Sequence, residues 1–183
     1  MQKINQDITG RCKNGDKDAF KEVVAAYQQM VFSLALKMLC DEDEAKDTTQ
    51  ETFIRVWTNI RRYDEKSSLS TWIYTIASHL CLDKIKKRQR IRPLPEDDAT
   101  LAQYMTTSDP QRYLENKEWI SIIKVLAENL SEKQRLVFTL CNLEGLNSSE
   151  VEQITGLDAR QIKSNLYAAR QKIRERLKNK GYE

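Results

Sequence analysis

Few residues in this chain have the type and spacing needed for catalysis or metal binding. Six acidic residues stand between Asp41 and Glu51, and clustered carboxylates can bind Mg²⁺. They fall at the expected start of a helix, where acids more often offset the partial positive charge of the N-terminus. The cysteines are widely scattered, at Cys12, Cys40, Cys81 and Cys141, and His79 is the single histidine. This spacing indicates neither a disulfide framework nor a zinc site, so we expect no metal and no cofactor.

Basic residues gather in two clusters, although the net charge of the 183 residues is only +3. Residues 84–92 hold six bases and no acid, and residues 160–180 hold eight bases against Glu175 alone. Two basic clusters far apart in sequence suggest two contacts with a polyanion. For either cluster alone, the alternative is the solvated end of a helix.

Helical periodicity dominates the chain, which has five glycines, three prolines and no convincing alternating strand. We predict an all-α protein of two small helical domains, at residues 1–91 and 113–183. The prolines fall between Arg92 and Pro110, where apolar residues thin out, so residues 92–112 are the predicted linker. A further helix is expected at 114–130. No apolar run approaches the roughly 20 residues of a membrane span, and the start lacks a signal peptide's apolar segment, so we expect a cytoplasmic protein without membrane insertion.

The second basic cluster follows a pattern of two helices joined by a glycine. Asn147 with Glu150 can cap a short helix that ends at Gly156, and Asp158 with Gln161 can cap a longer one. This layout predicts a helix-turn-helix, whose second helix enters the DNA major groove. Its core stripe is Ile162, Leu166, Ala169 and Ile173. The alternative is a plain helical hairpin with a solvated basic side.

The side chains that leave this core stripe are donors and acceptors suited to bases and phosphates. The candidate DNA-reading residues are Arg160, Gln161, Lys163, Ser164 and Tyr167.

The stretch DTTQETFIRVW, at 47–57, has an unusual polar side for a helix. Phe53, Val56, Trp57 and Ile60 gather on one side of the helical wheel, which predicts a core face. The opposite side carries Asp47, Gln50, Glu51, Arg55 and Thr58 rather than long Lys/Glu pairs. Judged from this stretch alone, a plain solvated face is the simpler interpretation.

Taken together, the motifs resemble a known family along most of the chain. They are the pattern DxxQxxFxxxW at Asp47, Gln50, Phe53 and Trp57, then SSLSTWIYTIA before the first basic cluster, then LEGL with the helix-turn-helix. In this order they resemble a bacterial sigma factor of the extracytoplasmic function group, the compact type with only the second and fourth sigma domains. The resemblance runs from GDKDAF at Gly15 to KKRQR in the first half, and from LSEKQRLVFTL to KIRERL in the second.

The resemblance implies a role for each cluster. The polar face of the DxxQxxFxxxW helix, with Asp47, Gln50, Glu51 and Arg55, would bind the clamp helices of core RNA polymerase, and Phe53 and Trp57 would remain core. The loop at 61–70 and the following helix would read and open the minus-ten promoter element. Its candidate residues are Tyr63, Ser67, Ser68, Thr71, Thr75 and His79, with Lys86 and Lys87 following the DNA backbone. The helix-turn-helix would bind the minus-35 element.

The implied protein is an initiation subunit without catalytic activity, whose partners are core RNA polymerase, promoter DNA and an anti-sigma factor. Four positions depart from the family pattern: His79 replaces Asn, Glu152 a small residue, Arg160 a Gly and Ala168 an Arg. Glu152 predicts a wider helix crossing or an outward side chain. Two alternatives remain: a transcriptional regulator whose first half senses or dimerises, and an enzyme such as a nuclease.

Overall fold

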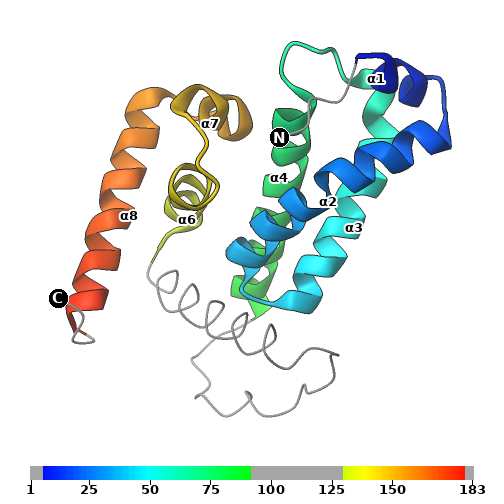
Figure 1. Cartoon of the computed structure of the whole chain (residues 1–183). Coiled ribbons are helices and arrows are strands. Elements are labelled where there is room, and N and C mark those ends of the chain that lie inside the picture. Colours follow the sequence, from blue (N-terminus) through cyan, green and yellow to red (C-terminus); the bar gives the residue numbers. More distant parts are fainter. Residues whose placement is uncertain (1–5, 92–129, 180–183) are drawn as a thin grey trace.

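The computed structural model describes residues 6–91 and 130–179, and all regular elements within those ranges are helical (Figure 1). The N-terminal domain contains α1 (Gln6–Lys13), α2 (Lys17–Leu39), α3 (Glu42–Asn59), the 3₁₀ turn η1 (Ile60–Arg62) and α4 (Leu69–Ile91). The C-terminal domain contains α6 (Glu132–Phe138), the π-helical turn η2 (Thr139–Leu143), α7 (Ser148–Thr155) and α8 (Ala159–Asn179). The all-α prediction is confirmed. The predicted linker lies outside the described residues, as does nearly all of the helix expected at 114–130.

Local signals define both ends of the long helix α2. The carboxylate of Asp16 accepts hydrogen bonds from the backbone amides of Asp18 and Ala19, at 2.9 and 3.1 Å. At the other end Cys40 adopts a left-handed conformation, with φ of 53°, and its amide donates to the Leu36 carbonyl. This turn lets the chain reverse into α3, so that α2 and α3 pack side by side (Figure 1).

The start of α3 shows how a tertiary contact changes a local motif. Asp41 caps the helix as expected, because its Oδ1 accepts a hydrogen bond from the Glu44 amide at 2.9 Å. In a complete capping box the Glu44 side chain would also accept a hydrogen bond from the Asp41 backbone amide. Its carboxylate instead pairs with Arg88 of α4, at 2.7 Å. The capping box is therefore only half formed, because an arginine is a stronger partner for a carboxylate than a backbone amide.

Two helices of the C-terminal domain begin with complete capping boxes, and the one at Asn147 confirms the cap predicted there. Reciprocal side-chain bonds join Ser131 to Gln134 at the start of α6, and Asn147 to Glu150 at the start of α7. Gly156 ends α7 with φ of 69°, a conformation that glycine adopts without steric cost. The predicted helix-turn-helix is therefore present, formed by α7, the turn and α8.

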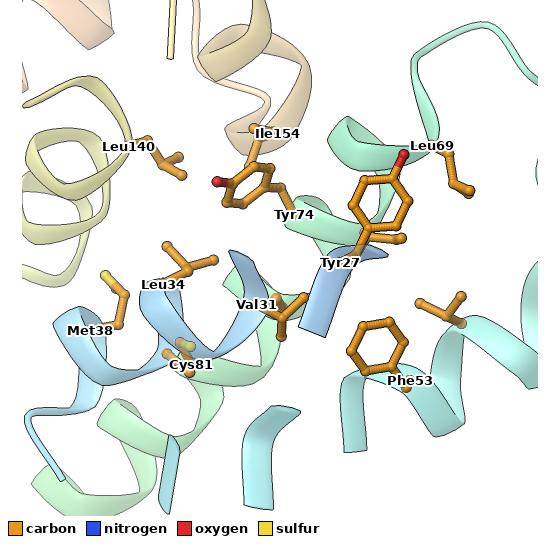
Figure 2. Packing of buried hydrophobic residues seen from close by; sticks show 14 of the residues in the cluster. Tyr27, Val31, Leu34, Met38, Phe53, Leu69, Tyr74, Cys81, Leu140 and Ile154 are labelled. Atoms are coloured by element: carbon orange, nitrogen blue, oxygen red, sulfur yellow. The ribbon is translucent and has the colours of Figure 1, made fainter. Parts of the chain in front are cut away.

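The two domains share one hydrophobic cluster, and α4 packs against α7 (Figures 1 and 2). Figure 2 shows Tyr74 of α4 close to Leu140 of η2 and Ile154 of α7. All three are at most 3% exposed. The domain contact is therefore a packed apolar interface.

Candidate functional surfaces

The outward face of α3 carries the residues expected to bind polymerase. Asp47, Gln50 and Arg55 are exposed, and Glu51 is half-buried. Arg55 donates to the Glu51 carboxylate at 2.6 Å, one helical turn away. The opposite face holds Phe53, Val56 and Ile60 in the core, as predicted. The pair at 51 and 55 is already neutralised, so Asp47 and Gln50 offer the most accessible polar groups of this face.

An apolar groove, which sequence reasoning missed, lies beside this face between α2 and α3. It is lined by apolar residues of both helices and by lysines and amides. Trp57, predicted to be core, is half-buried and lines the groove, and its ring lies 4.8 Å from that of Phe20. Ile54 is 56% exposed. An isoleucine on the polar side of the helical wheel was the signal that could have revealed the groove.

The loop before α4 is arranged around Tyr63. Its ring stacks on Trp72 at 5.1 Å, and its hydroxyl donates to the Ser67 carbonyl at 2.6 Å. The ammonium of Lys13 lies 5.5 Å from the ring centre, in a cation–π contact. Tyr63 is only 6% exposed, and this burial raises the pKa of its hydroxyl. Tyr63 therefore shapes the loop from within.

Hydroxyl groups organise the start of α4. The Ser68 hydroxyl lies 2.8 Å from those of Ser70 and Thr71 and accepts from the Thr71 amide at 3.1 Å. Thr71 is buried, whereas Ser68 is exposed and Ser67 is half-buried. Farther along α4, Thr75 is half-buried, and its hydroxyl donates to the Thr71 carbonyl at 2.9 Å. Of this group, Ser68 is the residue most accessible to a ligand.

The later turns of α4 separate its basic residues into two kinds. His79, Lys86 and Lys87 are exposed, and the Lys86 ammonium lies 4.0 Å from the Glu132 carboxylate. Arg88 turns instead toward its own domain, donating to the Leu39 carbonyl at 2.9 Å and to Glu44. The first basic cluster is thus only partly available to a polyanion.

In the helix-turn-helix, α8 presents the predicted reading residues outward. Ile162, Ala169 and Ile173 are buried and Leu166 is half-buried, which confirms the core stripe. The five candidates Arg160, Gln161, Lys163, Ser164 and Tyr167 are all exposed. Glu152, at the helix crossing, is half-buried.

The cap of α8 limits what one of these candidates can offer. The Asp158 carboxylate accepts from the Gln161 amide at 2.8 Å, and the Gln161 side-chain oxygen accepts from the Asp158 amide at 3.1 Å. Gln161 therefore has its amide nitrogen left for a base, as a donor. Tyr167 is 65% exposed and extends from the next turn.

Other basic residues of α8 bind their own domain. Arg170 donates to the Asn142 side chain of η2 at 3.2 Å, and Lys172 donates to Gln134 of α6 at 3.1 Å. These contacts join α8 to η2 and α6, whereas Arg174 and Lys178 of its later turns are exposed like the candidates of its first turns. The sequence alone counted all eight bases of this cluster alike.

The comparisons with known proteins follow the same division. The family model for sigma-70 region 2 matches residues 23–91, and that for sigma-70 region 4 matches residues 121–173. The ECF RNA polymerase sigma factor SigW of Bacillus subtilis (strain 168) is 29% identical over 174 residues, which cover 91% of this chain and 93% of that protein. The chain belongs to the extracytoplasmic function group of the sigma-70 family.

Further similarities agree with this assignment. The ECF RNA polymerase sigma-E factor of Escherichia coli (strain K12) is 27% identical over 179 residues, covering 94% of this chain and 93% of that protein. Sigma factors of this family bind core RNA polymerase and direct promoter-specific initiation, and this is the function of the chain.

Two solved structures share the fold. CnrH, in complex with the cytosolic domain of CnrY, superposes with a TM-score of 0.70 at 19% identity, covering 94% of this chain and 96% of CnrH. RpoE of Bartonella quintana, in complex with the anti-sigma factor NepR, gives 0.64 at 24%, covering 87% and 96%. Within residues 6–91 and 130–179 of the sigma factor, no helix has both the length and the hydrophobicity needed to cross a bilayer.

Proposed function

We propose that this sigma factor docks on core RNA polymerase through the outward face of α3 and the adjoining groove. The observation that carries the proposal is the placement of exposed Asp47 and Gln50 beside that groove. Protein interfaces commonly combine an apolar centre with a polar rim. Here Ile54 and Trp57 supply the apolar area, and Gln50 lies where this apolar area meets the polar face of α3.

The loop before α4 and the exposed side of α4 engage the minus-ten element. A base taken out of the stack needs polar groups at its edge, and exposed Ser68 and His79 are placed to supply them. Tyr63 and Thr71 act by positioning, because both are buried and hydrogen-bonded within the loop. Lys86 and Lys87 follow the backbone through contacts that carry no sequence information.

The first turns of α8 read the minus-35 element in the major groove. Arg160 and Lys163 are cations suited to guanine or phosphate, and the free nitrogen of Gln161 can donate to a base. Ser164 and Tyr167 extend the same exposed side.

The sigma factor acts in the cytoplasm, where polymerase is found, and performs no catalysis of its own. An anti-sigma factor is its expected inhibitor, because the similar RpoE of Bartonella quintana is seen in complex with one. A regulator that binds duplex DNA without polymerase is the competing function. It gives no reason for an exposed acid and amide beside an apolar groove on the domain opposite the helix-turn-helix.

A double substitution tests the docking face. Asp47→Ala with Gln50→Ala should weaken binding to core polymerase without lowering thermal stability, since both side chains are exposed and neither change opens a cavity. The matched control is Asp83→Ala with Gln153→Ala, an exposed acid and amide on α4 and α7. Equal affinity of the two folded double variants for core polymerase would remove α3 from the interface.

A further inference from the structure

The interface between the two domains contains a buried polar cluster as well as apolar packing. At its centre is Glu144, which directly follows η2 and whose side chain is only 9% exposed. Its Oε1 accepts from the Lys37 ammonium at 2.6 Å and from the Ser33 hydroxyl at 3.0 Å. Its Oε2 accepts from the Tyr74 hydroxyl at 2.9 Å. We call these four residues the Glu144 cluster.

All three side-chain donors to Glu144 come from the other domain. Ser33 and Lys37 lie one turn apart on α2, and Tyr74 projects from α4 (Figure 2). Lys37 also donates to the Leu143 carbonyl at 3.2 Å. Hydrogen bonds to a charged group are stronger than neutral ones, and a nearly buried carboxylate is costly to leave without them. The cluster therefore favours contact between the domains.

A second polar contact lies at the α2–α3 corner. The guanidinium of Arg135, on α6, donates to Sγ of Cys40 at 2.8 Å. The ring of Tyr74 also lies close to Leu140 and Ile154 in the shared hydrophobic cluster (Figure 2). The two domains therefore meet through both apolar burial and directional bonds, which fix one relative orientation. We call this packing of the two domains the closed arrangement.

In this closed arrangement the proposed binding surfaces stay uncovered. Asp47 and Gln50 on α3 are exposed, as are Arg160 and Lys163 on α8. The domain contact uses other surfaces, namely the faces of α4 and α7 around Tyr74 and Ile154, the side of α2 that bears Lys37, and Arg135 of α6. Closure therefore cannot prevent polymerase docking or DNA contact by covering these residues.

The closed arrangement limits how far apart the two proposed DNA-binding surfaces can lie. Elements centred at minus-ten and minus-35 are about 25 base pairs apart, or roughly 85 Å at the rise of B-form DNA. A compact chain of this length has a diameter of only about 40 Å. A closed chain can reach one element at a time, and bridging both requires the domains to separate.

We propose that the Glu144 cluster is a latch that holds the free sigma factor closed, in a state that cannot bridge the two promoter elements. This inference rests on the proposed assignment of one element to each domain. The latch must release before a promoter complex forms, so its strength sets a conformational cost on initiation. Weakening it raises the population of the open chain and with it the apparent promoter affinity.

Two variants test the latch. Glu144→Ala removes the shared acceptor, whereas Tyr74→Phe removes one donor and keeps the ring that packs at the interface. Glu175→Ala, an exposed acid of α8, is the matched control. Small-angle scattering of the free chain should give a larger radius of gyration for the two latch variants than for the parent and the control. Circular dichroism melting checks that each variant remains folded.

The second readout is transcription by polymerase reconstituted with each variant. The concentration of the Glu144→Ala variant that gives half-maximal transcription should fall by on the order of tenfold relative to the parent. The reason is that less free energy is needed to separate its two domains. An unchanged radius of gyration in both folded latch variants would overturn the latch, whatever the transcription result. Expansion combined with an unchanged half-saturating concentration would also overturn it. Expansion without promoter-directed transcription by any variant, including the parent, would support the latch and contradict the proposed function.

Discussion

Arg88 pairs with Glu44 through two contacts, Nε to Oε1 at 3.0 Å and a terminal nitrogen to Oε2 at 2.7 Å. The other terminal nitrogen donates to the Leu39 carbonyl at the end of α2. One arginine thereby joins the ends of α2 and α4 to the start of α3. Although Arg88 belongs to a basic cluster, its donors are used within the domain.

Arg88→Ala should therefore affect stability and leave the electrostatics of DNA binding nearly unchanged. We expect a loss of about 1 kcal/mol in the free energy of unfolding, a modest value because the side chain is partly solvated. The salt dependence of promoter binding by the polymerase complex should keep its slope. Urea unfolding and a salt titration measure the two effects. A slope lower by one would show that Arg88 contacts a phosphate.

Lys86 and Lys87 should behave in the opposite way. Replacing both with Ala should weaken binding to all promoter sequences alike, and the slope against salt should fall by about one for each lost phosphate contact. Stability should change little, since both side chains are exposed. The measurement is promoter affinity of the polymerase complex at several salt concentrations. Loss confined to one promoter would contradict a backbone role.

Substitutions in α8 should distinguish residues that read bases from residues that only hold the domain together. At least one of Arg160→Ala, Gln161→Ala and Lys163→Ala should relax preference at one base pair, at a cost of about 1–3 kcal/mol. Lys172→Ala is the matched control, because Lys172 binds Gln134 in the same domain. Transcription from templates randomised across the minus-35 element gives the preferred sequence of each variant. An unchanged preference in all three would show that this helix is docked differently.

Cys81 should make stability fall in alkaline solution. Burial raises the pKa of its thiol from 9.0 to about 12, and the side chain is fully buried. Between those values only the unfolded chain releases the proton, so stability is retained below pH 9 and lost as pH rises toward 12. Cys81→Ala should lower this decline in the free energy of unfolding by about 1 kcal/mol per pH unit. Urea unfolding at several pH values measures it, and Cys141→Ala should have a smaller effect, because burial also raises the pKa of this half-buried thiol. Identical slopes for parent and Cys81→Ala would contradict the burial.

Features set by neighbouring residues could be predicted from the sequence. The caps at Ser131, Asn147 and Asp158 and the turn at Gly156 depend on positions at most three residues apart. The core stripe of α8 follows from helical spacing. The polar face of α3 was found in the same way, because Asp47 and Gln50 fall opposite the buried residues.

Features set by distant residues could not be predicted. Glu144 lies in the recognised LEGL motif, but its partners stand 70 to 111 positions away. Arg88 differs in role from its neighbours Lys86 and Lys87 because the start of α3 brings Glu44 to its guanidinium. Tyr63 was expected at the minus-ten surface, but its side chain is buried in the loop, with its ring stacked on Trp72. Periodicity reports which face of a helix is apolar, and it does not report which element covers that face.

Transcription with purified components tests the central claim most directly. Core polymerase from the bacterium that encodes the chain is combined with the sigma factor and with genomic fragments, and the 5′ ends of the transcripts are mapped. The account predicts discrete start sites that appear only with the sigma factor and share one minus-ten and one minus-35 sequence. Substitution of at least one of Arg160, Gln161 and Lys163 should change the preferred sequence, and only within the minus-35 element. Transcripts identical with and without the sigma factor, from a preparation that binds the core enzyme, would contradict promoter-directed initiation by this chain.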